Sequence, residues 1–176
     1  SGFVFDNVVY NGDLLTNINY ITTGDMDAGG WVGVPKNTDQ AVSLNSTYGT
    51  NGWGLRSVVT NMGTSTDYVI KANENFHIDN NEKVTISFWA KATAAGKRLV
   101  PFVQDVNTTQ WMNMGDFNLT TAWKWYTCTA TMNQITSNNY QIKFRGYETV
   151  WIFLDKVQVG PPDWRTLLEV DIQYLN

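Results

Sequence analysis

The chain has 176 residues, enough for one domain with a substantial core and too few for a second independent core. Charged residues make up only 16%, so Asn, Thr, Ser and Gly must cover much of the surface, which fits an extracellular or particle-surface protein better than a cytosolic enzyme. The net charge of −4 and the scattering of the 12 basic residues argue against nucleic-acid binding, which needs clustered Lys and Arg.

The first residues show no targeting or membrane-spanning segment. The stretch "SGFVFDNVVYNGD" lacks the basic and apolar regions of a signal peptide. Nowhere does the chain contain the run of about 18 apolar residues that a membrane helix needs. The start at Ser1-Gly2 fits either a complete gene product that has lost its initiator methionine or a domain cut from a larger secreted protein. We expect the protein outside the cell or on the surface of a particle such as a virion.

Short runs that alternate apolar and polar residues predict an all-β domain. Clusters of Asn, Gly, Asp and Thr separate these runs, and no βαβ alternation is visible. Such a series of short strands is typical of a two-sheet antiparallel β-sandwich. The expected strands, in chain order, are "FVFDNVVY", "AVSLNS", "WGLRSVV", "DYVIKA", "KVTISFWAKA", "RLVPFVQDV", "WYTCTATM", "YQIKFRGY", "VWIFLDKVQV" and "LLEVDIQYL".

The segments outside the regular strands suggest loops and an appended arm. Residues 11–65 are rich in Gly, Asn and Thr, and we expect long loops there, in which Trp31 and Trp53 either wall a cleft or plug one end of the sandwich. Pro161 and Pro162 cannot continue a strand ladder. The sandwich is therefore expected over residues 1–160, and residues 161–176 are expected to form a linker followed by an extra strand or assembly arm.

The chain has a single cysteine, Cys128, and a single histidine, His77. This excludes an intramolecular disulfide and a multi-histidine metal site. Cys128 is predicted to be a small core residue and His77 to lie in a loop. The usual nucleotide, hydrolase and metalloprotease motifs do not occur, and nothing singles out a pair of carboxylates such as Asp116 with Glu148. We therefore do not expect an enzyme.

Alternate residues of a strand point to opposite faces of its sheet, which identifies side chains that face away from the core. In "KVTISFWAKA", Phe88 shares the core face with its apolar neighbours, so Trp89 faces the other way. Trp125 in "WKWYTCTATM" also faces outward, among threonines. In "YQIKFRGY", Lys143 and Arg145 lie on the face opposite the core.

Three of these segments, "VTISFWAKATAAG", "FNLTTAWKWYTCTATM" and "IKFRGYETVWIFLDKVQV", resemble the successive signatures of the carbohydrate-binding modules of families 4, 9 and 22. The resemblance covers about residues 80–160. It implies a jelly-roll sandwich of the galactose-binding-domain-like type. It also implies binding of glycans such as β-glucans or xylans in a cleft on the concave sheet, with an aromatic ring beneath the sugar.

The resemblance also implies a set of glycan-binding side chains. Trp89 matches the position of a cleft aromatic, and Trp111 falls where a second aromatic would approach the ligand. A pyranose ring stacks its C–H face on an aromatic ring, and its hydroxyls need amide or charged partners. Each assignment has an alternative: the tryptophans would be covered by loops or cap the sandwich, and the cations would form a solvated face. The predicted glycan-binding residues are Trp89, Trp111, Gln104, Gln110, Lys143 and Arg145.

A structural calcium ion is a further implication of the resemblance. Asp155 in "IFLDKVQV" matches the acidic position that the family associates with calcium. The family's N-terminal pattern is broken by "INYITTGDMD", so Asp25 or Asp27 would have to supply the missing acidic partner. Calcium takes about six to eight oxygen ligands, and a single matched carboxylate does not establish such a site.

Two classes of function remain open at this point. The first is a non-catalytic carbohydrate-binding module whose partner is a polysaccharide or a cell-surface glycan. The alternative is a structural virion component that reuses the same sandwich, either a capsid decoration protein or a tail-associated adhesion protein, with other virion subunits as its partners. Neither nucleic acid nor membrane insertion is expected for either class.

Overall fold

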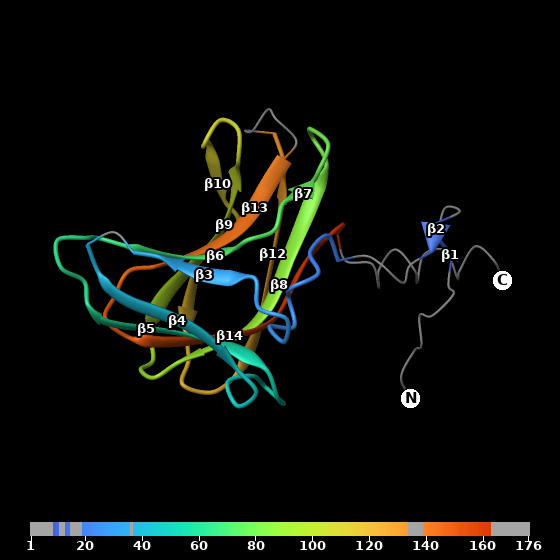
Figure 1. Cartoon of the computed structure of the whole chain (residues 1–176). Coiled ribbons are helices and arrows are strands. Elements are labelled where there is room, and N and C mark those ends of the chain that lie inside the picture. Colours follow the sequence, from blue (N-terminus) through green and yellow to red (C-terminus); the bar gives the residue numbers. More distant parts are fainter. Residues whose placement is uncertain (1–8, 11–12, 15–18, 36, 134–138, 163–176) are drawn as a thin grey trace.

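The strands of the protein form two facing antiparallel sheets. The computed structural model describes residues 9–10, 13–14, 19–35, 37–133 and 139–162, and over these residues the chain forms strands and loops without a helix. Figure 1 shows the two layers, and the predicted all-β sandwich is confirmed. No helix able to cross a membrane occurs in the described part of the chain. Apart from the sandwich sheets, a two-stranded ladder joins β1 (Val9–Tyr10) to β2 (Asp13–Leu14).

One layer is a seven-stranded sheet with the order β10-β9-β13-β6-β3, in which β11 also pairs with β9 and β7 with β13. All of these pairings are antiparallel. Its strands are β3 (Trp31–Val34), β6 (Tyr68–Ala72), β7 (Phe76–His77), β9 (Lys97–Asp105), β10 (Trp111–Asn113), β11 (Phe117–Leu119) and β13 (Asn139–Gly146).

The other layer is a five-stranded antiparallel sheet with the order β12-β8-β14-β5-β4. The pairing of β14 with β8 changes register between Asp155 and Gln158. Its strands are β4 (Asp39–Asn45), β5 (Gly54–Asn61), β8 (Lys83–Ala92), β12 (Lys124–Thr131) and β14 (Trp151–Gly160).

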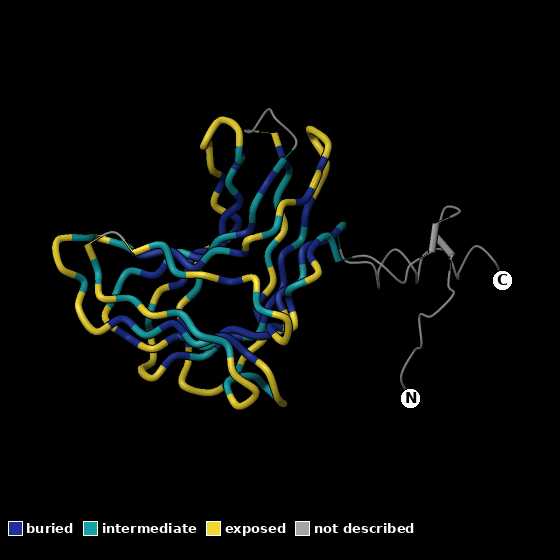
Figure 2. The backbone as a smooth tube through the Cα atoms, in the orientation of Figure 1, coloured by how far each residue is buried: buried dark blue, intermediate teal, exposed yellow. Residues whose placement is uncertain are grey.

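The core lies between the two sheets, and Figure 2 shows buried residues along the strands of both. Phe88 of β8 packs edge-on against Phe144 of β13, with 5.0 Å between their ring centroids, so the contact joins the two layers. Trp31 is also buried, with its ring 6.1 Å from that of Phe144 and its indole N–H donating to the Thr23 carbonyl at 2.9 Å. Trp31 is therefore a core residue that closes the sandwich, whereas Trp53 is exposed.

Pro101 occupies the middle of β9, although proline has no N–H for a sheet ladder. It lies between the residues of β9 that pair with β10 and those that pair with β11. Its carbonyl accepts a hydrogen bond from the Met114 N–H at 2.8 Å. In a strand the nitrogen points to the same side as the carbonyl, so the missing donor falls at the interruption between β10 and β11 and no ladder bond is lost there.

The longer predicted strands, from "AVSLNS" to "VWIFLDKVQV", correspond to β4, β5, β6, β8, β9, β12, β13 and β14. The short strands β3, β7, β10 and β11 were not predicted, because two to four residues give too little alternation to stand out. His77 accordingly lies in β7 rather than in a loop. Strand β14 ends at Gly160, directly before the two prolines. The proposed arm over residues 163–176 and most of "FVFDNVVY" lie outside the described residues.

Candidate functional site

The outer face of the seven-stranded sheet brings together several of the predicted site residues. In β9, Leu99 and Val103 point into the core, so Phe102 and Gln104 point outward. The register with β13 sets the outward residues of the two strands opposite one another. The facing pairs are Gln104 with Gln141, Phe102 with Lys143, and Val100 with Arg145.

An exposed tryptophan and a fixed arginine form the centre of this face. Trp111 of β10 pairs with Gln104 and is 55% exposed. The guanidinium carbon of Arg145 lies 4.6 Å from the ring centre of Phe102 and 5.6 Å from that of Trp111. Phe102 is consequently only 2% exposed although it points away from the core. Arg145 thus covers one ring and supports the other, and more than half of Trp111 remains accessible.

Asp67 holds Arg145 in this position. The Asp67 Oδ2 atom lies 3.0 Å from Arg145 Nε, and both side chains are largely buried. The N–H is not aligned with the oxygen for a hydrogen bond, so the contact is an ion pair. Asp67 directly precedes β6, the strand next to β13, which explains the proximity. Sequence reasoning missed both Asp67 and Phe102. Side-chain alternation places Phe102 on the same face as Gln104, which was a usable signal. Nothing in the sequence near Asp67 marked that residue.

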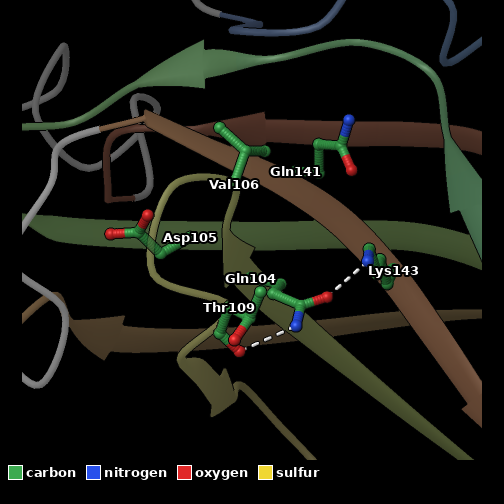
Figure 3. Close-up of a pocket in the computed structure, with 6 residues that line it drawn as sticks. All are labelled: Gln104, Asp105, Val106, Thr109, Gln141 and Lys143. Atoms are coloured by element: carbon green, nitrogen blue, oxygen red, sulfur yellow. Dashed lines mark hydrogen bonds between the residues drawn. The ribbon is translucent and has the colours of Figure 1, made fainter.

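A polar pocket of about 300 Å³ lies beside the hairpin between β9 and β10. Gln104 is at its centre in Figure 3, where its carbonyl oxygen accepts a hydrogen bond from the Lys143 ammonium and its amide donates to the Thr109 carbonyl at 2.8 Å. The Asp105 carboxylate points away from these groups and accepts from the backbone N–H groups of the hairpin turn. The residues that line the pocket are Gln104, Asp105, Val106, Thr109, Gln141 and Lys143.

Gln110 does not join this pocket. It is exposed in the hairpin turn, where its carbonyl accepts from the Asp105 N–H at 2.8 Å. It directly precedes Trp111, the first residue of β10, so the two side chains are expected on opposite faces. The structure therefore supplies Gln104 beside Trp111 and leaves Gln110 outside the group that lines the pocket.

The prediction that Trp89 shares one cleft with Lys143 and Arg145 is wrong. Trp89 belongs to β8 in the five-stranded sheet, whereas the two cations belong to β13 in the seven-stranded sheet. Trp89 faces outward as predicted, but on the far side of the sandwich. Its neighbours there are Trp125 of β12 and Asp155 of β14, which pair with it from either side.

Asp155 is engaged by the protein itself rather than held ready for a cation. It is 3% exposed, and its Oδ2 accepts hydrogen bonds from the Thr50 N–H and hydroxyl, both at 2.8 Å. Its Oδ1 accepts from the Lys156 N–H at 2.7 Å. Asp25 and Asp27 are exposed, and no three carboxylate, histidine or cysteine side chains of the described residues are grouped to hold a metal. This arrangement does not fit the oxygen shell that calcium requires.

The carboxylates considered as a catalytic pair both contact Arg98. Asp116 makes a two-point ion pair with the Arg98 guanidinium at 2.9 and 2.7 Å, and Glu148 accepts from the Arg98 backbone N–H at 3.0 Å. The hydrogen bond from Arg98 lowers the pKa of Asp116. A general acid needs the opposite shift, toward a raised pKa.

Comparison with solved structures decides the fold. A family 4 carbohydrate-binding module is 24% identical, with a TM-score of 0.59 over 80% of this chain and 99% of that chain. The fold is that of the carbohydrate-binding modules. A family 61 carbohydrate-binding module in complex with β-1,4-galactotriose is 13% identical, with a TM-score of 0.57 over 82% of this chain and 99% of that chain.

A third similar structure comes from a bacteriophage. The enzymatically active domain of tailspike protein 4 from bacteriophage CBA120 is 15% identical, with a TM-score of 0.62 over 91% of this chain and 24% of that chain. No family model and no curated protein matches the sequence. The likeness to carbohydrate-binding modules predicted from the three segments is therefore confirmed at the level of the fold.

Proposed function

We propose that the protein is a non-catalytic glycan-binding module and that a polysaccharide docks on the outer face of the seven-stranded sheet. In this proposal, that outer face is the concave binding face expected from the sequence. The observation that carries this proposal is Trp111, an indole 55% exposed beside a row of hydrogen-bonding side chains. A pyranose ring stacks on such an indole through its C–H face. Its hydroxyls then reach Gln104, Lys143 and Arg145.

The site is arranged before a ligand arrives, which favours binding. The ion pair with Asp67 and the contact with Phe102 hold Arg145 in place. The hydrogen bonds to Lys143 and to the Thr109 carbonyl hold Gln104. Side chains that are already ordered lose less conformational entropy on binding, so more of the interaction free energy appears as affinity.

The charge state of Asp116 argues against this group as the general acid of a glycosidase. Hydrolysis of a glycosidic bond by two carboxyl groups requires one of them to be protonated near neutral pH. Arg98 lowers the pKa of Asp116, so this group remains ionised there. Binding without hydrolysis is supported by the fold that the chain shares with isolated carbohydrate-binding modules.

The Trp111→Ala variant tests the proposal. The parent protein is first tested against a panel of β-glucans, xylan and galactan. We expect the affinity of the variant for the glycan that the parent binds to fall about tenfold or more, since a stacked ring contributes about 1 kcal/mol or more. Trp125→Ala is the matched control, because that indole is similarly exposed but lies on the other sheet. A parent protein that binds none of these glycans, or equal losses in both variants, would overturn the assignment.

The tailspike match favours a second candidate, a virion component at the particle surface. The shared fold extends over 91% of this chain, so a tail-associated adhesion domain or capsid decoration protein is compatible with the same sandwich. In that case other virion subunits are partners in addition to the glycan. Immunogold labelling of intact phage particles with an antibody against this chain tests the candidate, and unlabelled particles would refute it.

A further inference from the structure

The outer face of the five-stranded sheet carries a second group of aromatic side chains, together with two cationic side chains. The side chains come from β5, β8 and β14 and from the loops that precede β5 and β12. This face lies on the side of the sandwich opposite Trp111. We call it the aromatic–cation layer, and its members are Tyr48, Arg56, Lys91, Trp123, Trp151 and Phe153.

Each cation of the layer lies between two rings. The guanidinium carbon of Arg56 is 4.5 Å from the ring centre of Tyr48 and 5.0 Å from that of Trp151. The ammonium of Lys91 is 5.2 Å from Trp123 and 5.1 Å from Phe153. These distances are those of cation–π contacts, which hold a cation in place without neutralising its charge.

The rings also contact one another, so the layer is continuous. Phe153 lies edge-on to Tyr48, with 6.0 Å between ring centroids, and to Trp123, with 6.5 Å. Trp151 is 42% exposed at one end of the layer. A row of rings with cations between them therefore crosses the face from the loop before β12 to strand β5.

No carboxylate compensates these two cations within the described part of the chain. Arg56 and Lys91 take part in none of its ion pairs. Asp155 lies on the same face of the sheet, two residues after Phe153 in β14. It is 3% exposed, and Thr50 covers its Oδ2. The layer is thus locally positive on a chain whose net charge is −4.

We propose that the aromatic–cation layer binds an anionic polysaccharide, one that carries carboxylate or sulfate groups on its sugar rings. The exposed Trp151 offers a stacking surface for a ring, and Arg56 beside it offers a guanidinium that matches a planar carboxylate or a sulfate. The net negative charge of the protein repels polyanions in general, so binding requires these locally placed cations. This site is independent of the proposed site at Trp111.

Affinity gel electrophoresis with sodium polygalacturonate, dextran sulfate and unmodified dextran tests the inference. We expect polygalacturonate or dextran sulfate to retard the parent protein, which distinguishes carboxylate from sulfate recognition, and dextran to have no effect. Arg56→Gln and Trp151→Ala should each weaken binding about tenfold, the change that corresponds to one lost contact of about 1.4 kcal/mol. Trp151 is partly exposed, so its removal is expected to leave the fold intact, and thermal melting checks both variants.

Lys83→Gln is the matched control, because Lys83 is an exposed cation on the same sheet and lies outside the layer. An equal loss in this variant would mean general electrostatic attraction and would overturn the proposal. Absence of retardation by both polyanions would also overturn it. A parent dimer that Trp151→Ala dissociates, with no polyanion bound, would assign the layer to a second copy of the chain. Trp111→Ala should leave polyanion binding unchanged, which separates this result from that of the other face.

Discussion

Trp89 and Trp125 lie directly opposite each other on the adjacent strands β8 and β12, and both indoles are on the outer face of the five-stranded sheet. Trp125 is 49% exposed, while Trp89, flanked on its other side by β14, is only partly exposed. Cross-strand aromatic pairs of this kind stabilise a sheet by about 0.2–1 kcal/mol. The position of Trp89 thus gives it a role in the stability of this sheet.

Trp89→Ala should lower stability and leave binding at the Trp111 face unchanged. The loss of a partly buried indole and of its cross-strand pair is expected to cost about 1–3 kcal/mol. Urea unfolding measures the free energy, and titration with the glycan bound by the parent protein measures the affinity. A tenfold loss of affinity in a folded Trp89→Ala protein would contradict the separation of the two faces.

The outward position of Trp89 could be predicted from the sequence, but the sheet to which it belongs could not. Side-chain alternation is a local property of one strand, so it placed Trp89, Lys143 and Arg145 on outer faces correctly. Strand order depends on pairing between distant segments. The pairing that places β8 in one sheet and β13 in the other cannot be read from the sequence of either strand. A resemblance that covers residues from both strands therefore suggested one cleft where there are two faces.

Long-range contacts account for the rest of what was missed. Asp67 pairs with Arg145 because β6 and β13 are neighbours, a fact that neither segment reveals alone. The core could be predicted more fully, since the alternation that turns Trp125 outward turns Tyr126 and Met132 inward, and both are buried. Trp123, by contrast, packs against Phe153 on the outer face, a contact that depends on the pairing of distant strands.

Removal of calcium is expected to have no effect on thermal stability. The oxygens of Asp155 already accept three hydrogen bonds from Thr50 and Lys156, so the group needs no metal. Melting curves recorded with EDTA and with added calcium should coincide. Asp155→Ala, in contrast, should lower the melting temperature, since it removes hydrogen bonds to a buried charged group worth about 1.5–3 kcal/mol each. An upward shift of the melting temperature with calcium would contradict this prediction.

Stability should fall at alkaline pH because of Tyr68. Burial, and secondarily the negative charge of Glu148, raises the pKa of Tyr68 well above its ordinary value of 10. The unfolded chain releases this proton near pH 10 while the folded protein retains it. The contribution of Tyr68 to the free energy of unfolding is therefore fully present below pH 10. Above that value it falls by about 1.4 kcal/mol per pH unit.

Urea unfolding at a series of pH values between 9 and about 11.5 measures this loss, which spans the ordinary tyrosine pKa. Tyr68→Phe is the control, and it should reduce the pH dependence while it preserves the fold. The Tyr68 hydroxyl is buried and has no hydrogen-bond partner in the described part of the chain, so its removal leaves no polar group unsatisfied. An unchanged pH dependence in this variant would contradict the assignment.

The thiol of Cys128 should be unreactive in the folded protein. Burial raises its pKa to about 12, so almost none of the reactive thiolate is present near neutral pH. Its Sγ lies 3.8 Å from the Ile86 carbonyl oxygen, to which it donates, and it packs against the core. Reaction with a thiol-specific chromophore at pH 8 should be slow in buffer and fast in denaturing urea. Fast reaction without urea would show that this edge of the sandwich opens readily.

The proline in the middle of β9 bears on misfolding as well as on hydrogen bonding. With Pro101 opposite Phe144, the missing N–H falls where the edge of the sheet is interrupted. A slip of β9 by one residue would turn that nitrogen toward β13, remove a ladder bond and move Gln104 to the core side. The same proline thus penalises the alternative strand registers that a sequence rich in short β-segments could otherwise sample, and it keeps the side chains of β9 on the faces where they are found.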